Sequence, residues 1–163
     1  MKQIKFYLHK VTVDDKDVLF RLLQYSLFEE SATDGNQMGQ NGLFEYRWFD
    51  AYFTEPAREA FLIREKETNN LLGFAMVCNH VRTLNVGHSI AEFMVLPPYR
   101  RNGIGKRVAH QLFEMHTGGW EVKPSVGSKS AKNFWKNTIQ EYTNSDFIFQ
   151  SGVFVFENKK AQK

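Results

Sequence analysis

The sequence is poor in cysteine and holds no long apolar run. Cys78 is the only cysteine among the 163 residues, so a disulfide framework and a cysteine-rich zinc site are both excluded. No segment approaches the roughly 20 apolar residues that a membrane span needs, and the first ten residues lack the apolar stretch of a signal peptide. We therefore expect a cytoplasmic protein that does not enter a membrane.

The histidines also lack the spacing of a metal site. His80, His88, His110 and His116 form no H-x-x-x-H pair and have no cysteine partner, so we expect no bound metal. Internal repeats, low-complexity tracts and Pro/Ser-rich linkers are absent too. With 42% hydrophobic residues, the chain is expected to form one domain over residues 1–157, followed by a polar tail over 158–163.

The positive charge is concentrated in one part of the chain. The formal net charge is +3, but residues 97–137 carry eight Lys or Arg against only Glu114 and Glu121, so this segment alone is about +6. Such a segment is typical of proteins that bind an anionic ligand, for example a nucleotide or a nucleic acid. A solvated basic surface is the alternative interpretation.

Apolar periodicity and turn residues predict a mixed order of strands and helices. Helices are expected at residues 16–30, 43–53, 103–116 and 129–139, and strands at 4–8, 60–65, 71–78, 88–96, 120–126 and 147–156, the last one turning near Ser151-Gly152. The strands on either side of Asn69-Asn70 carry a hairpin signal. The order β-α-α-β-β-β-α-β-α-β-β indicates a mixed α/β fold.

The most informative segment follows the strand expected at 88–96. Two prolines end the strand, a turn rich in Arg and Gly follows, and a helix opens with Gly103 and Gly105 in its first turn. The first N–H groups of a helix lack partners within the helix and attract anions, and glycine permits close approach to the backbone. Arg100 and Arg101 add charge-assisted hydrogen bonds to phosphate. This segment is therefore predicted to bind a pyrophosphate.

Two well-known nucleotide loops do not fit this segment. A dinucleotide loop needs G-x-G-x-x-G after the first strand of a βαβ unit, whereas here only G-x-G is present, beyond the middle of the chain, and the P-loop pattern is absent. Arg100-x-x-Gly103-x-Gly105 after an apolar strand instead resembles the acetyl-CoA signature of the GNAT superfamily of N-acetyltransferases. The resemblance is sharpest over residues 89–126, and the order of elements resembles the family along nearly the whole chain.

The resemblance implies a fold, a reaction and a cofactor site. The fold is a central, mostly antiparallel mixed sheet of six or seven strands with helices on both faces. The reaction moves an acetyl group from acetyl-CoA to a primary amine within a ternary complex, without a metal. The pantetheine arm is expected along the backbone of Phe93, Met94 and Val95, with a backbone N–H near Met94 for the oxyanion. Further contacts are implied for Arg100, Arg101, Asn102, Gly103, Ile104, Gly105, Lys106, Asn133 and Trp135.

Candidates for the acid and the base lie on either side of the Gly103 loop. Glu92 shares a strand face with Met94, and a carboxyl among apolar neighbours has the raised pKa that a general base needs; an ion pair with Lys or Arg is the alternative. Trp135 stands where many family members carry a Tyr, and Trp cannot donate a proton as a phenol does. Tyr142 is the substitute acid; otherwise the thiolate leaves without one. Ser128 replaces the family's pantetheine-contacting Asn.

The acceptor side is predicted from the aromatic and acidic first half of the chain. Tyr46, Trp48 and Glu92 are candidates for binding a small-molecule amine, such as a polyamine, an amino acid or an aminoglycoside. Two other functions stay open: a non-catalytic acyl-CoA-binding module, which Trp135 allows, and, more distantly, a nucleic-acid binder. A homodimer paired through the C-terminal strands also stays open.

Overall fold

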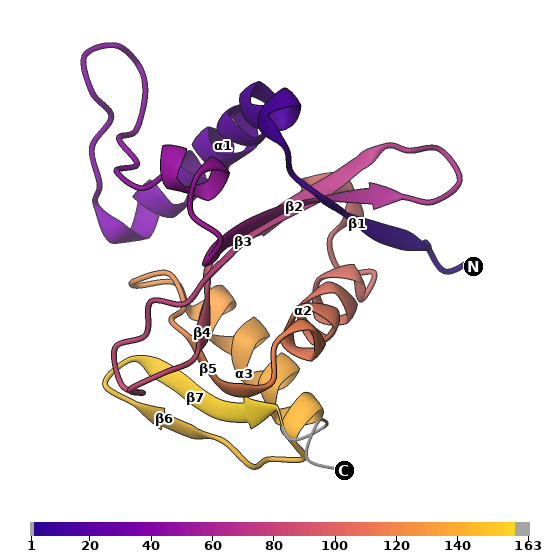
Figure 1. Cartoon of the computed structure of the whole chain (residues 1–163), viewed down its shortest axis with the longest axis vertical. Coiled ribbons are helices and arrows are strands. Elements are labelled where there is room, and N and C mark those ends of the chain that lie inside the picture. Colours follow the sequence, from indigo (N-terminus) through magenta and orange to yellow (C-terminus); the bar gives the residue numbers. More distant parts are fainter. Residues whose placement is uncertain (1, 159–163) are drawn as a thin grey trace.

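A seven-stranded sheet runs through the computed structural model, which describes residues 2–158 (Figure 1). The spatial order is β1-β2-β3-β4-β5-β7-β6, and every neighbouring pair is antiparallel except β4 and β5. The strands are β1 (Phe6–Lys10), β2 (Arg58–Glu65), β3 (Leu71–Cys78), β4 (His88–Val95), β5 (Gly118–Val122), β6 (Ile148–Gln150) and β7 (Val153–Asn158). The helices are α1 (Lys16–Asp34), α2 (Ile104–Met115) and α3 (Lys129–Thr143), with short turns η1 (Val13–Asp15), η2 (Asp50–Phe53) and η3 (Pro97–Tyr99).

Helices cover both faces of the sheet, which confirms the predicted architecture (Figure 1). On one face, α1 and η2 pack against side chains such as Phe74 and Met76 of β3. On the other face, α2 and α3 pack against Ala75 and Val77 of the same strand. Successive side chains of a strand point to opposite faces, so β3 is buried from Leu72 to its end. Its nearly continuous apolar sequence follows from this double burial.

Helix α1 is one turn longer than the sequence indicates. The predicted end at residue 30 lies inside the helix, which continues to Asp34 and ends where Gly35 adopts a left-handed conformation with φ of 76°. Thr12 and Asp15 form a capping box at the preceding turn η1. The additional turn matters because it brings Asp34 close to Glu30 and to Glu92 of β4.

The aromatic segment 43–53 is not the predicted α-helix. Only η2 is helical there, as a short 3-10 turn. The side-chain amide of Gln24 on α1 forms hydrogen bonds with both backbone groups of Phe44. It accepts from the N–H and donates to the carbonyl, each at 2.8 Å. Those backbone groups are therefore unavailable to a helix, and Phe44, Phe49 and Tyr52 are buried against α1 and the sheet instead.

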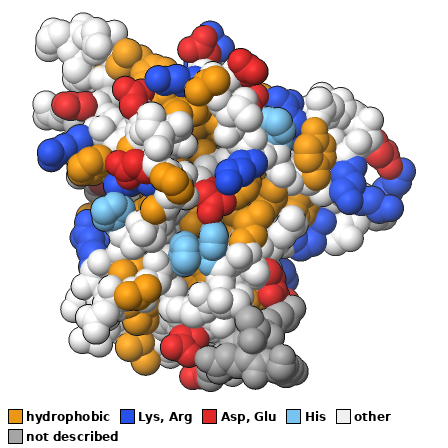
Figure 2. Space-filling view, in the orientation of Figure 1, with side chains coloured by type: hydrophobic (Ala, Val, Ile, Leu, Met, Phe, Trp, Pro, Cys, Tyr) orange, Lys and Arg blue, Asp and Glu red, His pale blue; other side chains and the backbone are white. Residues whose placement is uncertain are grey.

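The other predicted elements are present with shifted ends. The hairpin at Asn69-Asn70 and the C-terminal hairpin at Ser151-Gly152 both form, with Asn69 and Ser151 at positive φ. Asn158 belongs to β7 and donates to the carbonyl of Phe113 at 2.8 Å, so it is not part of a tail; the rest of the expected tail lies outside the described residues. Within residues 2–158, no helix is both long and apolar enough to cross a membrane. On the face seen in Figure 2, charges of both signs are interspersed with apolar side chains.

Strands β4 and β5 diverge soon after they meet. Their parallel pairing covers only three residues of each strand, from His88 to Ile90 on β4, whereas β4 continues to Val95. On its other edge β4 stays paired with β3, and the N–H of Leu96 bonds to the Leu72 carbonyl at 2.8 Å. Backbone groups alternate between edges along an antiparallel strand, so those of Phe93 and Val95 face the edge that β5 has left.

We predict that Gly73→Ala will destabilise the protein and disturb this part of β4. A Cβ at residue 73 would lie 2.0 Å from the Met94 carbonyl oxygen, so the two strands must move apart. Overpacking of this kind costs about 1–3 kcal/mol, measurable as a lower free energy of unfolding in urea. Gly39→Ala is the matched control, because there the added Cβ meets mainly the side-chain oxygen of Asn41 at 3.0 Å. Equal stability of the two variants would contradict the prediction.

Candidate active site

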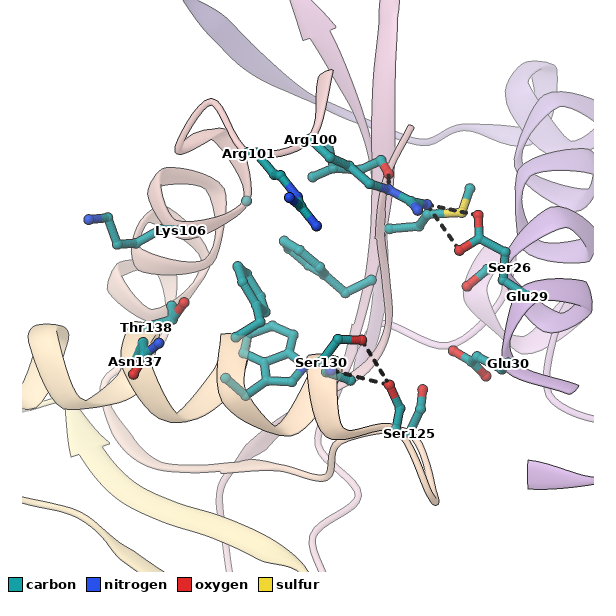
Figure 3. A pocket seen from close by; sticks show the side chains of 18 of the residues that line it. Ser26, Glu29, Glu30, Arg100, Arg101, Lys106, Ser125, Ser130, Asn137 and Thr138 are labelled. Carbon is teal, nitrogen blue, oxygen red and sulfur yellow. Dashed lines mark hydrogen bonds and ion pairs between the residues drawn. The ribbon is translucent and has the colours of Figure 1, made fainter. Parts of the chain in front are cut away.

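A cavity of about 800 Å³ opens along the free edge of β4, between α1, α2 and α3 (Figure 3). It brings together most of the residues that the sequence indicates for a cofactor. The predicted residues that line it are Phe93, Met94, Val95, Arg100, Arg101, Gly103, Gly105, Lys106 and Trp135. Asn102, Ile104 and Asn133 do not line it: Ile104 is buried in the core and the other two side chains are exposed.

The start of α2 borders the cavity and has the geometry of an anion site. Gly103 caps the helix with φ of 75°, a left-handed conformation that favours glycine. No atom lies within 4 Å of the place where a Cβ of residue 103 would stand, so a ligand can reach the backbone there. The first N–H groups of α2 have no partners within the helix, and Gly105 and Lys106 of this turn line the cavity. A pyrophosphate fits this arrangement.

Gly105 has a different role, in packing α2 against α3. A Cβ at residue 105 would lie 3.1 Å from the ring of Phe134. That ring meets Trp135 edge-to-face at 4.9 Å between centroids, and Trp135 meets Phe93 at 5.0 Å. The glycine thus lets the aromatic wall of the cavity approach the cofactor loop.

The Arg100 side chain reaches across the opening of the cavity, and its guanidinium group is already hydrogen-bonded to other protein groups. Its Nε donates to the Val95 carbonyl at 2.7 Å, and a terminal N–H group donates to the Glu29 carboxylate at 2.8 and 3.1 Å (Figure 3). The loop, β4 and α1 are thereby joined. Arg101 points into the cavity in Figure 3, and no carboxylate of the described residues forms an ion pair with it. Arg101 is therefore the better placed arginine for an anionic ligand.

The backbone hydrogen bonds of β4 determine which N–H groups could stabilise an oxyanion. Met94 pairs with Phe74 in the β3–β4 ladder, two residues before the bonded pair of Leu96 and Leu72. By alternation, the Met94 N–H points toward β3 and is already used. The Met94 N–H itself is therefore not free, and the N–H groups near Met94 that face the cavity, as the predicted oxyanion contact requires, are those of Phe93 and Val95.

Two carboxyl groups, Glu30 of α1 and Glu92 of β4, meet at one end of the site. Burial, together with the nearby Glu30 charge, raises the pKa of Glu92 well above its usual range. Burial also raises the pKa of Glu30, and hydrogen bonds from Ser125 and Ser26 oppose the rise. Tyr46, a predicted acceptor residue, lies beside Glu92, but it lines a separate cavity with Phe20 and Phe44 instead of this one. No Lys or Arg among the described residues is ion-paired with Glu30 or Glu92.

Two predicted residues lie away from the cavity. The Tyr142 ring packs against His110 at 5.2 Å and Phe113 at 5.1 Å, in the core between α2, α3 and the sheet; burial raises its pKa to about 12. Trp48 is largely exposed, with the Arg58 guanidinium 5.0 Å from its ring centre. These placements do not support Tyr142 as the acid or Trp48 as an acceptor contact.

Sequence reasoning missed Glu30, although the sequence holds a signal for it. Leu23, Ser26 and Leu27 lie on the buried face of α1, and residue 30 continues that face at spacings of three and four. A charged residue on a buried helical stripe needs a partner or a function.

Comparison with a protein-family model decides the family. The model of the acetyltransferase (GNAT) family matches residues 24–135, which include most of α1, the free edge of β4 and the loop before α2. The chain belongs to the GNAT acetyltransferase family. In this GNAT domain, buried Trp135 lines the cavity. Within residues 2–158, no group of three or more His, Cys, Asp or Glu is placed to hold a metal ion.

Solved structures share the fold of this GNAT domain. An acetyltransferase from Thermus thermophilus has a TM-score of 0.71 and 14% identity, covering 97% of this chain and 100% of its own. Spermidine N-acetyltransferase from Vibrio cholerae, in complex with CoA and spermine, has 0.63 and 10%, covering 97% and 98%. AtaTR bound with acetyl-CoA has 0.53 and 11%, covering 99% and 98%. Identities this low show the fold alone. A comparison with curated protein sequences gives no significant match.

We predict that Glu92 makes the protein less stable as the pH rises. Its pKa is raised in the folded state, so between the ordinary value of about 4.3 and the raised one the unfolded chain has already released the proton that the folded chain retains. The free energy of unfolding should therefore fall with pH above about 4.3, and Glu92→Gln should flatten this fall.

Urea unfolding of both proteins between pH 5 and 8 measures the effect. Glu157→Gln, at an exposed position of β7, controls for the change in net charge and should keep the wild-type slope. Parallel curves for the wild type and Glu92→Gln would contradict a raised pKa of Glu92 in the folded protein.

Proposed function

We propose that this protein transfers the acetyl group of acetyl-CoA directly to a primary amine of a small molecule. The proposal rests on one observation: three features lie in succession along one cavity. An open strand edge at Phe93 and Val95 leads at one end to the glycine-bearing start of α2, and at the other end to the carboxyl pair of Glu30 and Glu92. An extended amide chain, a diphosphate and an amine match these three features in that order.

The chain's own groups suit a CoA thioester. The exposed backbone groups of Phe93 and Val95 can bond an extended arm as an added strand would. The amides at the start of α2, with Arg101 and Lys106 beside them, suit the diphosphate. When bound, acetyl-CoA supplies the activated acetyl group. A cavity-facing N–H of β4 is then placed to stabilise negative charge on the acyl oxygen.

The acceptor end suits a cationic amine. An ammonium group must lose a proton before it can attack, and a carboxyl of raised pKa is matched to that task near neutral pH. The V. cholerae neighbour was crystallised with spermine, which makes spermidine a suitable first probe. No Tyr lines the cavity among the described residues, so we propose that water protonates the leaving thiolate.

A non-catalytic acyl-CoA-binding module is the second candidate. It is favoured by one observation, the presence of Trp135 in the cavity where many family members carry a Tyr. Nucleic-acid binding has less support: Arg100 and Lys106 are ion-paired with Glu29 and Glu141, and the face in Figure 2 shows no stripe of one charge.

Release of CoA from acetyl-CoA distinguishes the two candidates. We expect the wild-type protein to release CoA when supplied with at least one amine from a panel of spermidine, amino acids and aminoglycosides, with mass spectrometry identifying the acetylated product. Calorimetric binding of acetyl-CoA without turnover of any amine would favour the binding module. Absence of binding would contradict both.

We predict that Gly103→Glu will abolish CoA binding. The substitution places a negative charge at the diphosphate site and a side chain at a residue with φ of 75°, which disfavours residues other than Gly, Asn and Asp. Isothermal titration calorimetry with CoA should show at least about a 100-fold weaker Kd, since loss of a charge-assisted contact and a like-charge repulsion each cost about 1–3 kcal/mol.

Gly103→Asn is the matched control for this substitution. Asn tolerates the left-handed conformation and is neutral, so most of the affinity should remain. If Gly103→Glu binds CoA as the wild type does, the diphosphate does not lie at the start of α2.

A further inference from the structure

We propose that Glu30 of α1 accepts the proton of the acceptor amine, and that Glu92 acts behind it as a neutral hydrogen-bond donor. The inference rests on the proposed function and assigns the base to a residue outside the β4 strand. It moves the role of general base from Glu92, the residue predicted from the sequence, to Glu30.

The cavity supplies the first argument. Glu30 lines it, together with Ser26 and Ser125, whereas Glu92 is not among the lining residues. In Figure 3 the Glu30 side chain extends from α1 toward the cavity, near Ser125. A base must come within hydrogen-bonding reach of the proton that it removes, directly or through one water. Glu30 meets this requirement for a ligand in the cavity, whereas Glu92 lies behind Glu30 and does not line the cavity.

The polar groups around the pair supply the second argument. Glu30 and Glu92 interact closely enough for each to shift the pKa of the other, and two adjacent carboxyl groups do not readily both ionise. That interaction raises the pKa of Glu92 and opposes the rise in the pKa of Glu30, as expected if Glu92 is the O–H donor and Glu30 the charged acceptor. The hydroxyl groups of Ser125 and Ser26, which line the cavity together with Glu30, also favour the charged form of Glu30. In the proposed arrangement the pair carries one proton, on Glu92, and one negative charge, on Glu30, the carboxyl that lines the cavity.

The charged groups around the pair do not neutralise the negative charge proposed for Glu30. Asp34, one turn further along α1, adds a like charge to both carboxyls. Tyr46 lies beside Glu92, and Tyr52 and Cys78 lie close to Tyr46. Glu29, the neighbour of Glu30 on α1, is ion-paired with Arg100. A cationic amine is therefore a suitable partner for the Glu30 carboxylate, and desolvation keeps the carboxylate basic enough to deprotonate it.

The proton balance of the step is simple. The acceptor enters as an ammonium ion, and one of its protons moves to the Glu30 carboxylate, which leaves a neutral amine and a neutral carboxyl pair. The amine nitrogen bonds to the acyl carbon, the carbon–sulfur bond breaks, and the thiolate departs with the electron pair. The nitrogen loses a second proton through water to the thiolate, and Glu30 returns its proton to solvent. The products are an amide, a thiol and one released proton.

Steady-state kinetics of variants separate the two carboxyls. Spermidine is the acceptor used, or the best amine of the panel if spermidine is not acetylated. Glu30→Gln should lower kcat/KM by about 10²–10⁴-fold at all pH values, the usual contribution of a general base, while the Kd for CoA stays within about twofold of wild type. Glu92→Gln retains an N–H donor for Glu30 and should keep kcat/KM within about tenfold, with the acidic limb of its pH profile close to that of wild type.

Two further variants complete the kinetic test. Glu92→Leu removes the donor to Glu30, so its acidic limb should move to higher pH. A purely structural role for Glu92 would lower activity without moving the limb. Asp17→Asn, at an exposed position in the first turn of α1, controls for loss of a carboxylate and should behave as wild type. The proposal is overturned if Glu92→Gln abolishes activity while Glu30→Gln retains it, or if the two lose activity equally.

Titration of the carboxyl carbons by NMR gives a readout that needs no turnover. The ¹³C-labelled wild type should show a carboxyl that titrates well above an ordinary Glu, and both Glu30→Gln and Glu92→Gln should change that titration because the groups are coupled. If Glu30→Gln leaves it unchanged, the pair does not share a proton. If the wild type acetylates no amine, the proposed function and the catalytic role of Glu30 both fail, while this titration still decides the pairing.

Discussion

The divergence of β4 from β5 is the constraint on which the site depends. A buried strand edge must satisfy its N–H and C=O groups, and beyond Ile90 this edge of β4 has no strand beside it. In the protein alone, the Arg100 side chain satisfies the Val95 carbonyl. The edge is therefore a place where an extended ligand gains backbone hydrogen bonds without displacing any part of the sheet. The cavity exists because the sheet opens there, and the strand that opens it also carries Glu92.

Packing around that opening holds the two chemical ends in place. On one side, Gly105 lets Phe134 approach α2, which keeps the start of that helix at the cavity. On the other side, α1 continues beyond Leu27, its last buried leucine, and places Glu30 at the edge of the cavity. The ion pair of Arg100 with Glu29 joins these two sides, but it is partly exposed and such pairs contribute only about 0–1 kcal/mol. The arrangement thus depends mainly on the apolar cores beneath it.

Local patterns allowed much of the fold and of the cofactor loop to be predicted. Strand alternation, turn residues and the Arg100-x-x-Gly103-x-Gly105 spacing are encoded within short segments, and the structure has each of them. The failures involve contacts between distant residues. The Gln24 amide that holds Phe44 prevents a helix that the aromatic residues alone suggest, and Glu29 pairs with Arg100 across 71 positions of sequence. Tyr142 lies seven residues after Trp135, so the helical rise carries it about 10 Å along α3, away from the cavity.

Amide hydrogen exchange measured by NMR, with and without CoA, tests the central claim most directly. The account predicts that CoA slows exchange of the Phe93 and Val95 amides, which face the open edge, and leaves the Met94 amide unchanged because it already bonds to β3. If CoA binds while Phe93 and Val95 exchange as fast as before, the ligand does not lie along β4, and the account of this site is wrong.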